Sequence, residues 1–441
     1  MTYEEAIAAL YARRWLGMKL GLRNVRRLAA LVGNPHQDLR FVHVAGTTGK
    51  GSTCAMLEAI YRAQGYRVGL FLSPHLVSFR ERMQVNRRPI GKADVVRLAE
   101  ELERRIASAN DPGFAPTFFE MATVMALLWF REQGCELVMW ETGMGGRLDA
   151  TNLVRPSAAV ITNVQFDHQQ WLGDSLEAIA AEKAGIIKPG APAVTGVEEP
   201  GPLDVIWRRA FEAGAPLRTV GPEDLEAPPI REARLPLPGA HQRRNAALAL
   251  AVAEVLQPQF PVSSFALRKG LESVRLSGRC QMVRDAEGRL TALDGAHNPA
   301  GARALAATLR ELFPGRRYVL VAGALQDKDW PGMWEAFAEG AEAAWLAPVA
   351  SSRSADPGRL AAHARLTRPG LPVRTAGDLR EALAKTARAP MRVITGSLYL
   401  VGEALGLLGL ESGEGNPGGD WAAVSAPGTS SGEPAGGGAA L

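Results

Sequence analysis

A glycine-rich loop with one lysine is the first feature of this chain that could do chemistry. The segment AGTTGKGST (45–53) follows an apolar run (41–46) and leads into a helical pattern (52–65). Glycines let backbone N–H groups approach phosphate oxygens, and the positive end of the following helix adds to the attraction. We therefore predict a nucleoside triphosphate site in which Lys50 reaches the β- and γ-phosphates and Ser52 offers its hydroxyl to Mg²⁺. The alternative is a glycine-rich turn that serves packing alone.

Polar side chains also follow the ends of other predicted strands. Glu141 comes after one apolar run, Asp167 and His168 come after another, and Ser73 ends a third. The carboxyl ends of parallel strands are where α/β sheets bind ligands, and a carboxylate there suits Mg²⁺. Imidazole is a less usual magnesium ligand, but His168 stands in a position parallel to that of Glu141. We predict a metal role for both; the alternatives are a strand-end cap for Glu141 and an ordinary hydrogen-bonded histidine.

Lysine is uncommon in this chain, since eight lysines stand among 50 Lys and Arg residues. Lys183 follows His168 by fifteen positions, in AEKAGIIKPG. A neutral lysine amine can take up CO₂ to form a carbamate, which would turn a cation into a carboxylate ligand near Mg²⁺. Burial and neighbouring charge would set the pKa that this requires. The alternative is a surface lysine without a role in the site.

The alternation of apolar runs with helical patterns predicts the elements that must position these residues. A strand, a helix and a second strand follow one another over 41–73, which is a βαβ unit and implies a parallel sheet. We predict a P-loop-type doubly wound α/β domain over 1–280 and a smaller Rossmann-like α/β domain over 288–410. The boundary is expected within 275–288, which has no strong periodicity. The Gly-, Pro- and Ser-rich stretch 413–441 predicts a disordered tail.

Composition excludes several other classes of protein. The 441 residues suggest two or three domains, and the net charge of +4, from 50 basic minus 46 acidic residues, does not favour nucleic acid. No apolar run reaches the roughly 18–20 residues of a membrane helix, and the first residues do not resemble a signal peptide. Cys54, Cys135 and Cys280 lie far apart, which argues against a disulfide framework or a zinc site. We expect a cytoplasmic monomer that binds neither nucleic acid nor membrane.

Together the motifs resemble those of the folylpolyglutamate synthase/dihydrofolate synthase family, within the Mur ligase superfamily. Eight segments carry the resemblance, in the order that is typical of the family: HVAGTTGKGST, FLSPHLVSFRERMQVN, FFEMATVMAL, ETGMGGRLDATN, ITNVQFDHQQWLG, AEKAGIIKPG, GAHQRRNAALAL and DGAHNPAG. The DKD segment (327–329) also matches. The resemblance implies ATP-driven addition of L-glutamate to dihydropteroate or folate through an acyl phosphate, with Mg²⁺ bound at two sites.

The resemblance also implies roles for individual residues. Those that would bind ATP are Gly49, Lys50, Gly51, Ser52, Asn245, Arg279 and Asp294. One Mg²⁺ would be held by Ser52, Ser73 and Glu141, and the second by Glu141, His168 and a carbamoylated Lys183. Lys50, His168 and Lys183 would be the catalytic residues. The pterin or folate pocket would be lined by Gly21, Leu22, Thr117, Phe118, Phe119, Glu120, Leu148, Asp149 and Ala150.

Other functions share parts of this pattern. A P-loop kinase or NTPase would begin with the same loop but would need neither the second domain nor the set formed by Glu141, His168 and Lys183. A cell-wall Mur ligase would carry a UDP-binding domain before the loop, where only 45 residues precede Gly46. A non-catalytic nucleotide-binding module would not need metal ligands at several strand ends. Within the family, residues 21–24 match a segment that typically reads GLxR, and Asn24 replaces its Arg, so the preference between dihydropteroate and folate stays open. The sequence also leaves open whether one or both activities are present.

Overall fold

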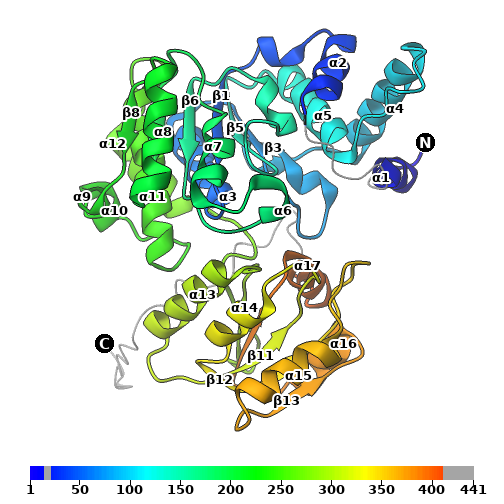
Figure 1. Cartoon of the computed structure of the whole chain (residues 1–441), viewed down its shortest axis with the longest axis vertical. Helices are drawn as coiled ribbons and strands as arrows, with labels where there is room; N and C mark the ends of the chain where they lie inside the picture. The colour runs from blue at the N-terminus through cyan, green and yellow to red at the C-terminus, as the bar shows by residue number, and fades with distance from the viewer. Residues whose placement is uncertain (14–20, 411–441) are drawn as a thin grey trace, which may run out of the picture.

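The computed structural model describes residues 1–13 and 21–410, which form two α/β bodies, one above the other in Figure 1. The predicted tail over 413–441 lies outside the described residues. Each body contains one sheet covered by helices on both faces, so the predicted α/β class with two sheets is confirmed. Within the described ranges, no helix combines the length and the apolar character needed to cross a membrane.

The first body is built on an eight-stranded sheet in the order β4-β3-β2-β5-β1-β6-β7-β8. The strands from β2 to β8 in this order are parallel, whereas β3 and β4 add an antiparallel edge that the sequence did not predict. All five residues of the central β1 are buried, as expected for a parallel strand covered on both faces. The bounds are β1 (Phe41–Ala45), β2 (Val68–Phe71), β3 (Met83–Val85), β4 (Arg88–Pro89), β5 (Leu137–Glu141), β6 (Ala158–Ile161), β7 (Ala193–Thr195) and β8 (Leu217–Thr219).

Alternate residues of these strands pack into two different hydrophobic cores, one on each face of the sheet. Phe41, Phe71 and Trp140 pack together on one face, where the rings of Phe71 and Trp140 lie 4.5 Å apart. Val42 and Val44 point to the other face. The first face is covered by α2 (Arg23–Leu31), α4 (Lys92–Ser108), α5 (Phe118–Glu132), α7 (Leu176–Ala184) and α8 (Pro200–Glu212), and the second by α3 (Lys50–Gln64), α11 (Ala240–Leu256) and α12 (Ser264–Ser273). The other helices of this body are α1 (Tyr3–Ala12), α6 (Gln169–Leu172), α9 (Pro222–Leu225) and α10 (Pro228–Glu232).

The second body contains a six-stranded sheet in the order β13-β12-β11-β14-β10-β9. Only β9 in this sheet runs antiparallel, and it lies inside the segment 275–288 where the sequence indicated no element. Its strands are β9 (Gln281–Arg284), β10 (Leu290–Leu293), β11 (Tyr318–Ala322), β12 (Ala341–Leu346), β13 (Val373–Thr375) and β14 (Met391–Thr395). Its helices are α13 (Pro299–Leu312), α14 (Trp330–Phe337), α15 (Pro357–Thr367), α16 (Leu379–Lys385) and α17 (Leu398–Leu407). The second body therefore begins before residue 288, at the segment 278–280 that leads into β9 and is hydrogen-bonded to Asp294 and Gly295.

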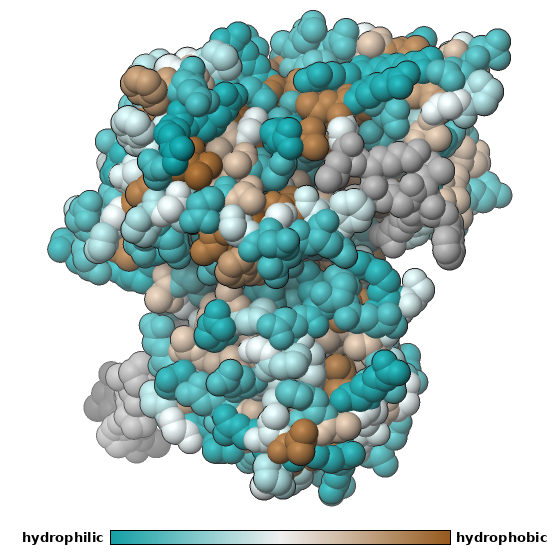
Figure 2. All heavy atoms as spheres, in the orientation of Figure 1, coloured by the Kyte–Doolittle hydropathy of each residue, from teal (hydrophilic) through white to brown (hydrophobic). Residues whose placement is uncertain are grey.

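The two bodies meet at a waist that is visible in the space-filling view (Figure 2). In this view hydrophobic residues are scattered among hydrophilic ones on both bodies. The helix α17 lies at the top of the lower body, next to the upper one (Figure 1). Leu76 and Val77 of the first body pack against the core of the second, beside Val401. Contact between the bodies is therefore partly apolar and is made by short segments on each side.

Candidate active site

The order of the strands determines which loops meet. β2, β5, β1 and β6 are consecutive neighbours and run in parallel, with Val44 paired to Glu141 and Ala45 paired to Ile161. Their carboxyl ends therefore lie along one edge of the sheet. Ser73 follows β2, Glu141 ends β5, the glycine-rich loop follows β1, and the segment of Asp167 and His168 follows β6. The structure places these predicted site residues at one edge, as an α/β ligand site requires.

The glycine-rich loop is held in shape by the segment that follows the neighbouring strand β6. The Asn163 side-chain oxygen accepts hydrogen bonds from the N–H groups of Thr47 and Thr48, at 3.1 and 2.9 Å. The Lys50 Nζ lies back over the loop and donates to the carbonyls of Gly46 and Thr47, at 3.0 and 3.3 Å. Sequence reasoning missed Asn163, since a single Asn after a strand gives no signal that it supports a distant loop. The loop is thus a preformed turn with its lysine in place.

Asn245 reaches this loop from α11. A methyl group added to Gly49 would lie 2.4 Å from the Asn245 side-chain oxygen, so glycine allows the two segments to touch. Gly49 also has a φ of 80°, a backbone conformation that favours glycine. The Asn245 amide donates to Gln242 at 3.0 Å, which fixes its orientation. The predicted ATP-binding residues of the first body therefore lie around one loop.

Glu141 and Ser73 offer oxygen atoms beside the start of α3. The Glu141 carboxylate is buried and accepts a hydrogen bond from the Ser73 N–H at 2.8 Å, while the Ser73 hydroxyl is buried without a hydrogen-bond partner. Burial raises the pKa of Glu141, and the positive charge of Lys50 offsets this rise only in part. Ser52 is buried in the first turn of α3. A buried carboxylate and an unpaired hydroxyl fit a hard cation such as Mg²⁺, which prefers oxygen ligands.

The positive charge of Lys50 affects the pKa of both Lys183 and His168. Burial lowers the pKa of Lys183 to about 7, and repulsion from Lys50 adds to the shift. Burial also lowers the pKa of His168, against the nearby Asp167 carboxylate, and Lys50 contributes there too. Because Lys50 acts on Lys183, His168 and Glu141 alike, these four side chains belong to one electrostatic site.

A metal site made only of ordinary acidic, histidine or cysteine ligands is absent from the described part of the chain. Across residues 1–13 and 21–410, no three His, Cys, Asp or Glu side chains are grouped closely enough to hold a metal ion. The predicted second set contains only Glu141 and His168 of these types. A third ligand there would have to come from Lys183, which is buried with an amine whose pKa allows a substantial neutral fraction near pH 7. The residues present therefore fit the carbamate hypothesis.

The second body contributes Arg279 and Asp294. Both Asp294 oxygens accept backbone hydrogen bonds, from the N–H groups of Cys280 at 2.7 Å and Ala296 at 2.8 Å. Burial raises the pKa of Asp294, and Arg279 partly offsets the rise. The charge of Arg279 also acts on Glu141 across the domain boundary. Of these two residues, Arg279 is the one whose charge reaches the edge where Glu141 lies, and the contact of either residue with a nucleotide stays a prediction.

The predicted folate-pocket residues form two adjoining groups. Thr117 and Glu120 cap α5 by reciprocal hydrogen bonds of 2.7 and 3.3 Å, so both side chains are used locally. Phe119 packs against Gly143, where an added methyl group would lie 2.6 Å from its ring. Phe118 lies under Arg82, whose guanidinium carbon is 5.2 Å from the ring centroid. An aromatic ring beside a guanidinium suits a flat, polar heterocycle.

The loop after Gly143 makes up the other group. Asp149 accepts hydrogen bonds from the N–H groups of Met144 and Thr151, at 2.8 and 3.0 Å, which shape the loop around it. The Gly21 N–H donates to the Leu148 carbonyl at 3.3 Å, so the segment of Gly21 and Leu22 meets the segment that runs from Leu148 to Ala150. The side chains of Asp149 and Glu120 shape their own loops, and their contact with substrate stays a prediction. Sequence reasoning missed Arg82, which lies in the FLSPHLVSFRERMQVN motif.

Two Mur ligase domains match this chain. Residues 44–200 match the Mur ligase middle domain, and residues 278–397 match the domain described as Mur ligase, glutamate ligase domain. The chain is 38% identical over 352 residues to the dihydrofolate synthase/folylpolyglutamate synthase of Bacillus subtilis, a match that covers 75% of this chain and 81% of that protein. This chain belongs to the folylpolyglutamate synthase/dihydrofolate synthase family. The resemblance inferred from the eight motifs is confirmed.

Solved structures of family members share the whole fold. A folylpolyglutamate synthase from Mycobacterium tuberculosis, solved with ADP and AMPPCP, is 32% identical with a TM-score of 0.82, and the match covers 92% of this chain and 99% of that one. Escherichia coli FolC in complex with DHPP and ADP is 31% identical with a TM-score of 0.80, covering 92% of this chain and 97% of that one. The two matching ligase domains disfavour the kinase alternative, and the identity to a dihydrofolate synthase/folylpolyglutamate synthase over most of the chain disfavours a cell-wall ligase.

Proposed function

We propose that this chain is an ATP-dependent carboxylate–amine ligase that adds L-glutamate to dihydropteroate and to (poly)glutamylated folates through an acyl phosphate. The observation that supports the proposal is the convergence of the phosphate loop, Glu141 and His168 at one sheet edge, where the charge of Lys50 also acts on Lys183. The charge of Arg279 reaches Glu141 from the second body. The names of the relatives, and the nucleotides and DHPP in the titles of two of their structures, support both the reaction and the use of ATP.

The chain's residues divide the work of this reaction. The free carboxylate of the folate attacks the γ-phosphate, which gives an acyl phosphate and ADP, and the amine of glutamate then attacks the acyl carbon as phosphate leaves. The N–H groups of the glycine-rich loop and the Lys50 ammonium face the phosphates and offset their charge. Arg279 brings a further positive charge from the second body. Lys328 and Asn298 of the second body contact Asp167 beside the loop, and closure of this body over the loop would shield the acyl phosphate from water.

Ser52, Ser73 and Glu141 would hold one Mg²⁺, and Glu141, His168 and carbamoylated Lys183 a second. When bound, these ions supply neutralisation of phosphate charge and polarisation of the transferred phosphoryl group. The carbamate follows from chemistry on this chain: the neutral Lys183 amine attacks CO₂, an N–C bond forms, and one proton leaves to solvent. Cytoplasmic location and the monomeric state stay predictions.

Phosphate release tests the reaction. Purified protein is given ATP, Mg²⁺ and either dihydropteroate or a reduced folate, with and without L-glutamate, and the products are identified by mass spectrometry. We expect phosphate release that depends on both the acid and glutamate, with a product extended by one glutamyl unit. Turnover with dihydropteroate as well as folate would establish both activities. ATP consumption that ignores glutamate would overturn the ligase proposal and favour a kinase or NTPase.

The carbamate is tested separately on Lys183. Carbon-13 NMR in labelled bicarbonate should show a carbamate signal that is absent from Lys183→Arg, and this variant should lose most ligase activity. Lys188→Arg is the matched control, because Lys188 is partly buried on the same segment and donates to the Gly185 carbonyl at 3.2 Å. An active wild-type protein without the signal would count against the carbamate.

A further inference from the structure

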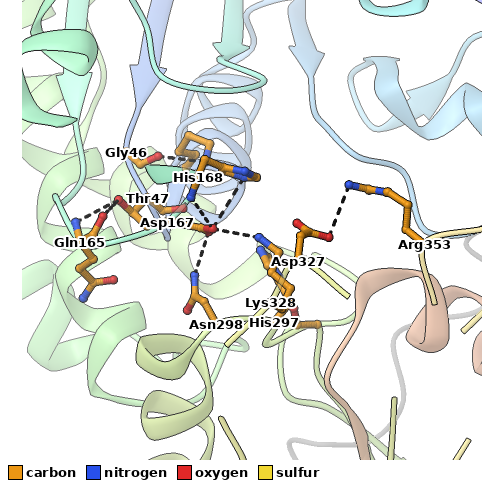
Figure 3. Close-up of polar contacts among 12 residues, drawn as sticks. Gly46, Thr47, Gln165, Asp167, His168, His297, Asn298, Asp327, Lys328 and Arg353 are labelled. Carbon is orange, nitrogen blue, oxygen red and sulfur yellow. Dashed lines mark hydrogen bonds and ion pairs between the residues drawn. The ribbon is translucent and has the colours of Figure 1, made fainter. Parts of the chain in front are cut away.

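One buried ion pair joins the two bodies directly beside the candidate active site (Figure 3). The Lys328 ammonium lies 2.9 Å from Oδ1 of Asp167, and the two side chains are only 9% and 11% exposed. Asp167 follows β6 of the first body, whereas Lys328 precedes α14 of the second. The Asn298 amide, also from the second body, donates to Oδ2 of Asp167 at 3.2 Å. Both carboxylate oxygens of one residue are thus bound across the domain boundary.

Contacts within the second body leave Asn298 and Lys328 available to Asp167. Asn298 caps α13, and its side-chain oxygen accepts the Gly301 N–H at 2.8 Å, which leaves its amide pointing across the boundary. The acidic neighbour of Lys328, Asp327, pairs with Arg353 of its own body at 3.6 Å and so does not compete for the ammonium. Figure 3 shows Lys328 and Asn298 converging on the Asp167 carboxylate, with Asp327 turned toward Arg353.

The same carboxylate also sets the backbone of a predicted metal ligand. Oδ1 of Asp167, the atom that Lys328 contacts, accepts the N–H of His168 at 2.9 Å. His168 has a φ of 53°, which is uncommon for a residue other than glycine and needs support from its surroundings. Asp167 therefore connects the seating of the second body to the conformation of His168. Burial would raise the pKa of Asp167, but the charge and hydrogen bond of Lys328, together with His168 and His297, lower it below its ordinary value.

We propose that Asp167 is a positioning residue, which fastens the second body over the phosphate loop through Lys328 and Asn298 and thereby holds His168 in place. The phosphate loop, Asn163 and Asn245 belong to the first body, so nucleotide can bind without this contact. The contact matters when the second body must close over the loop. Its loss leaves one buried charge without its partner, which favours separation of the two bodies.

The kinetic test uses isosteric and matched variants, and it rests on the proposed ligase activity. Asp167→Asn and Lys328→Met should each lower kcat about 10- to 100-fold, since small misplacements of reacting groups have effects of this size. The KM for ATP should change much less. The double variant should be no slower than the slower single variant, because both changes remove one contact. Asp327→Asn, which breaks only the pair with Arg353, is the control and should stay within about twofold of wild type.

A distance measurement tests the same contact without relying on catalysis. Spin labels at Ser108→Cys on α4 and Leu366→Cys on α15 report the separation of the bodies; both sites are exposed and the three native cysteines are buried. We expect broader and longer distances in Asp167→Asn and in Lys328→Met, at an unchanged melting temperature of the first body, and a wild-type distribution in Asp327→Asn. Wild-type distances in both interdomain variants would overturn the proposal. Independent, multiplicative losses of kcat in the double variant would also overturn it, even if the ligase activity itself is confirmed.

Discussion

At the scale of single residues, the phosphate loop depends on one backbone conformation more than on its glycine content. Gly49 and Gly51 flank Lys50, and nothing in the sequence distinguishes their roles. In the structure only Gly49 has a positive φ, of 80°, and only its added methyl group would approach another side chain closely, the Asn245 oxygen at 2.4 Å. Gly51 lies within α3, where an added methyl group would meet Glu141 at an ordinary 3.5 Å. The two glycines therefore have different physical reasons to be present.

This difference predicts opposite effects on stability. Gly49→Ala should lower the free energy of unfolding by about 1–2 kcal/mol, since an alanine is strained at that φ. Gly51→Ala should leave it unchanged or raise it by up to about 1 kcal/mol, because alanine is the better helix former. Urea unfolding of the two variants without nucleotide measures this directly. If Gly49→Ala and Gly51→Ala lowered the free energy of unfolding equally, crowding in the loop, and not backbone conformation, would explain the loss of stability.

His43 gives a prediction for acid sensitivity. Its ring is fully buried in β1, where Nε2 lies 2.9 Å from the Thr151 hydroxyl, and burial lowers its pKa to about 3 from an ordinary value of 6.5. Between pH 6.5 and about 3 the unfolded state binds the proton and the folded state does not. Stability contributed by the neutral ring is therefore present above pH 6.5 and falls with pH through this window, by up to about 1.4 kcal/mol per pH unit.

We expect His43→Gln to unfold at lower urea concentration at pH 7 but to lose less stability than wild type between pH 6.5 and 5. The measurement is the urea midpoint at several pH values in this range. His363→Gln, on α15 and only partly buried, is the control and should keep the wild-type slope. Parallel pH profiles for wild type and His43→Gln would mean that other groups dominate the acid response.

At the scale of elements, the sequence was informative where chemistry and strand ends coincide. The apolar strands β1, β5 and β6 are short, fully buried runs, so the positions of the loop, Glu141 and His168 at their ends could be predicted. The edge strand β9 could not, because only one of its four residues, Met282, is buried and no apolar run marks it. The contact of Asp167 with Lys328 spans 161 residues, and no local pattern relates two such positions. Long-range pairing follows from the tertiary fold alone.

The helix α17 approaches the first body closely at Gly402, and this contact allows the separation of the two bodies to be tested. A methyl group on Gly402 would lie 2.0 Å from the Leu76 carbonyl oxygen, a backbone atom of the other body that has little freedom to move. Gly402→Ala should therefore push the bodies apart and lower kcat about 10- to 100-fold. Gly406→Ala in the same helix, where an added methyl group meets nothing within 4 Å, should keep wild-type activity. Small-angle scattering would report the separation; an active, compact Gly402→Ala would show that the interface yields easily.

At the scale of the whole molecule, each body has the means to fold alone while neither has a complete site. The buried clusters of the first body draw on residues up to Val274, and those of the second begin at Cys280. Segments shared between the two bodies are few: Leu76 and Val77 of the first pack against the second. By contrast, the proposed site draws its phosphate loop from the first body and the predicted ATP-binding residues Arg279 and Asp294 from the second. We therefore expect one body to be enough for folding, whereas catalysis requires both.

A fragment of residues 1–277, which ends before β9, tests whether the first body can fold and bind nucleotide without catalysing the reaction. It should unfold cooperatively, because the first sheet keeps both of its helical layers, and it should still bind ADP through the glycine-rich loop and Asn245. We expect its affinity for ADP to fall about tenfold, equivalent to about 1.4 kcal/mol, through loss of the groups that face the nucleotide from the second body. It should form no amide bond, since nothing would shield the acyl phosphate from water. Calorimetric titration with ADP and mass spectrometry of the folate products measure both; glutamylated product from this fragment alone would refute a site shared between two bodies.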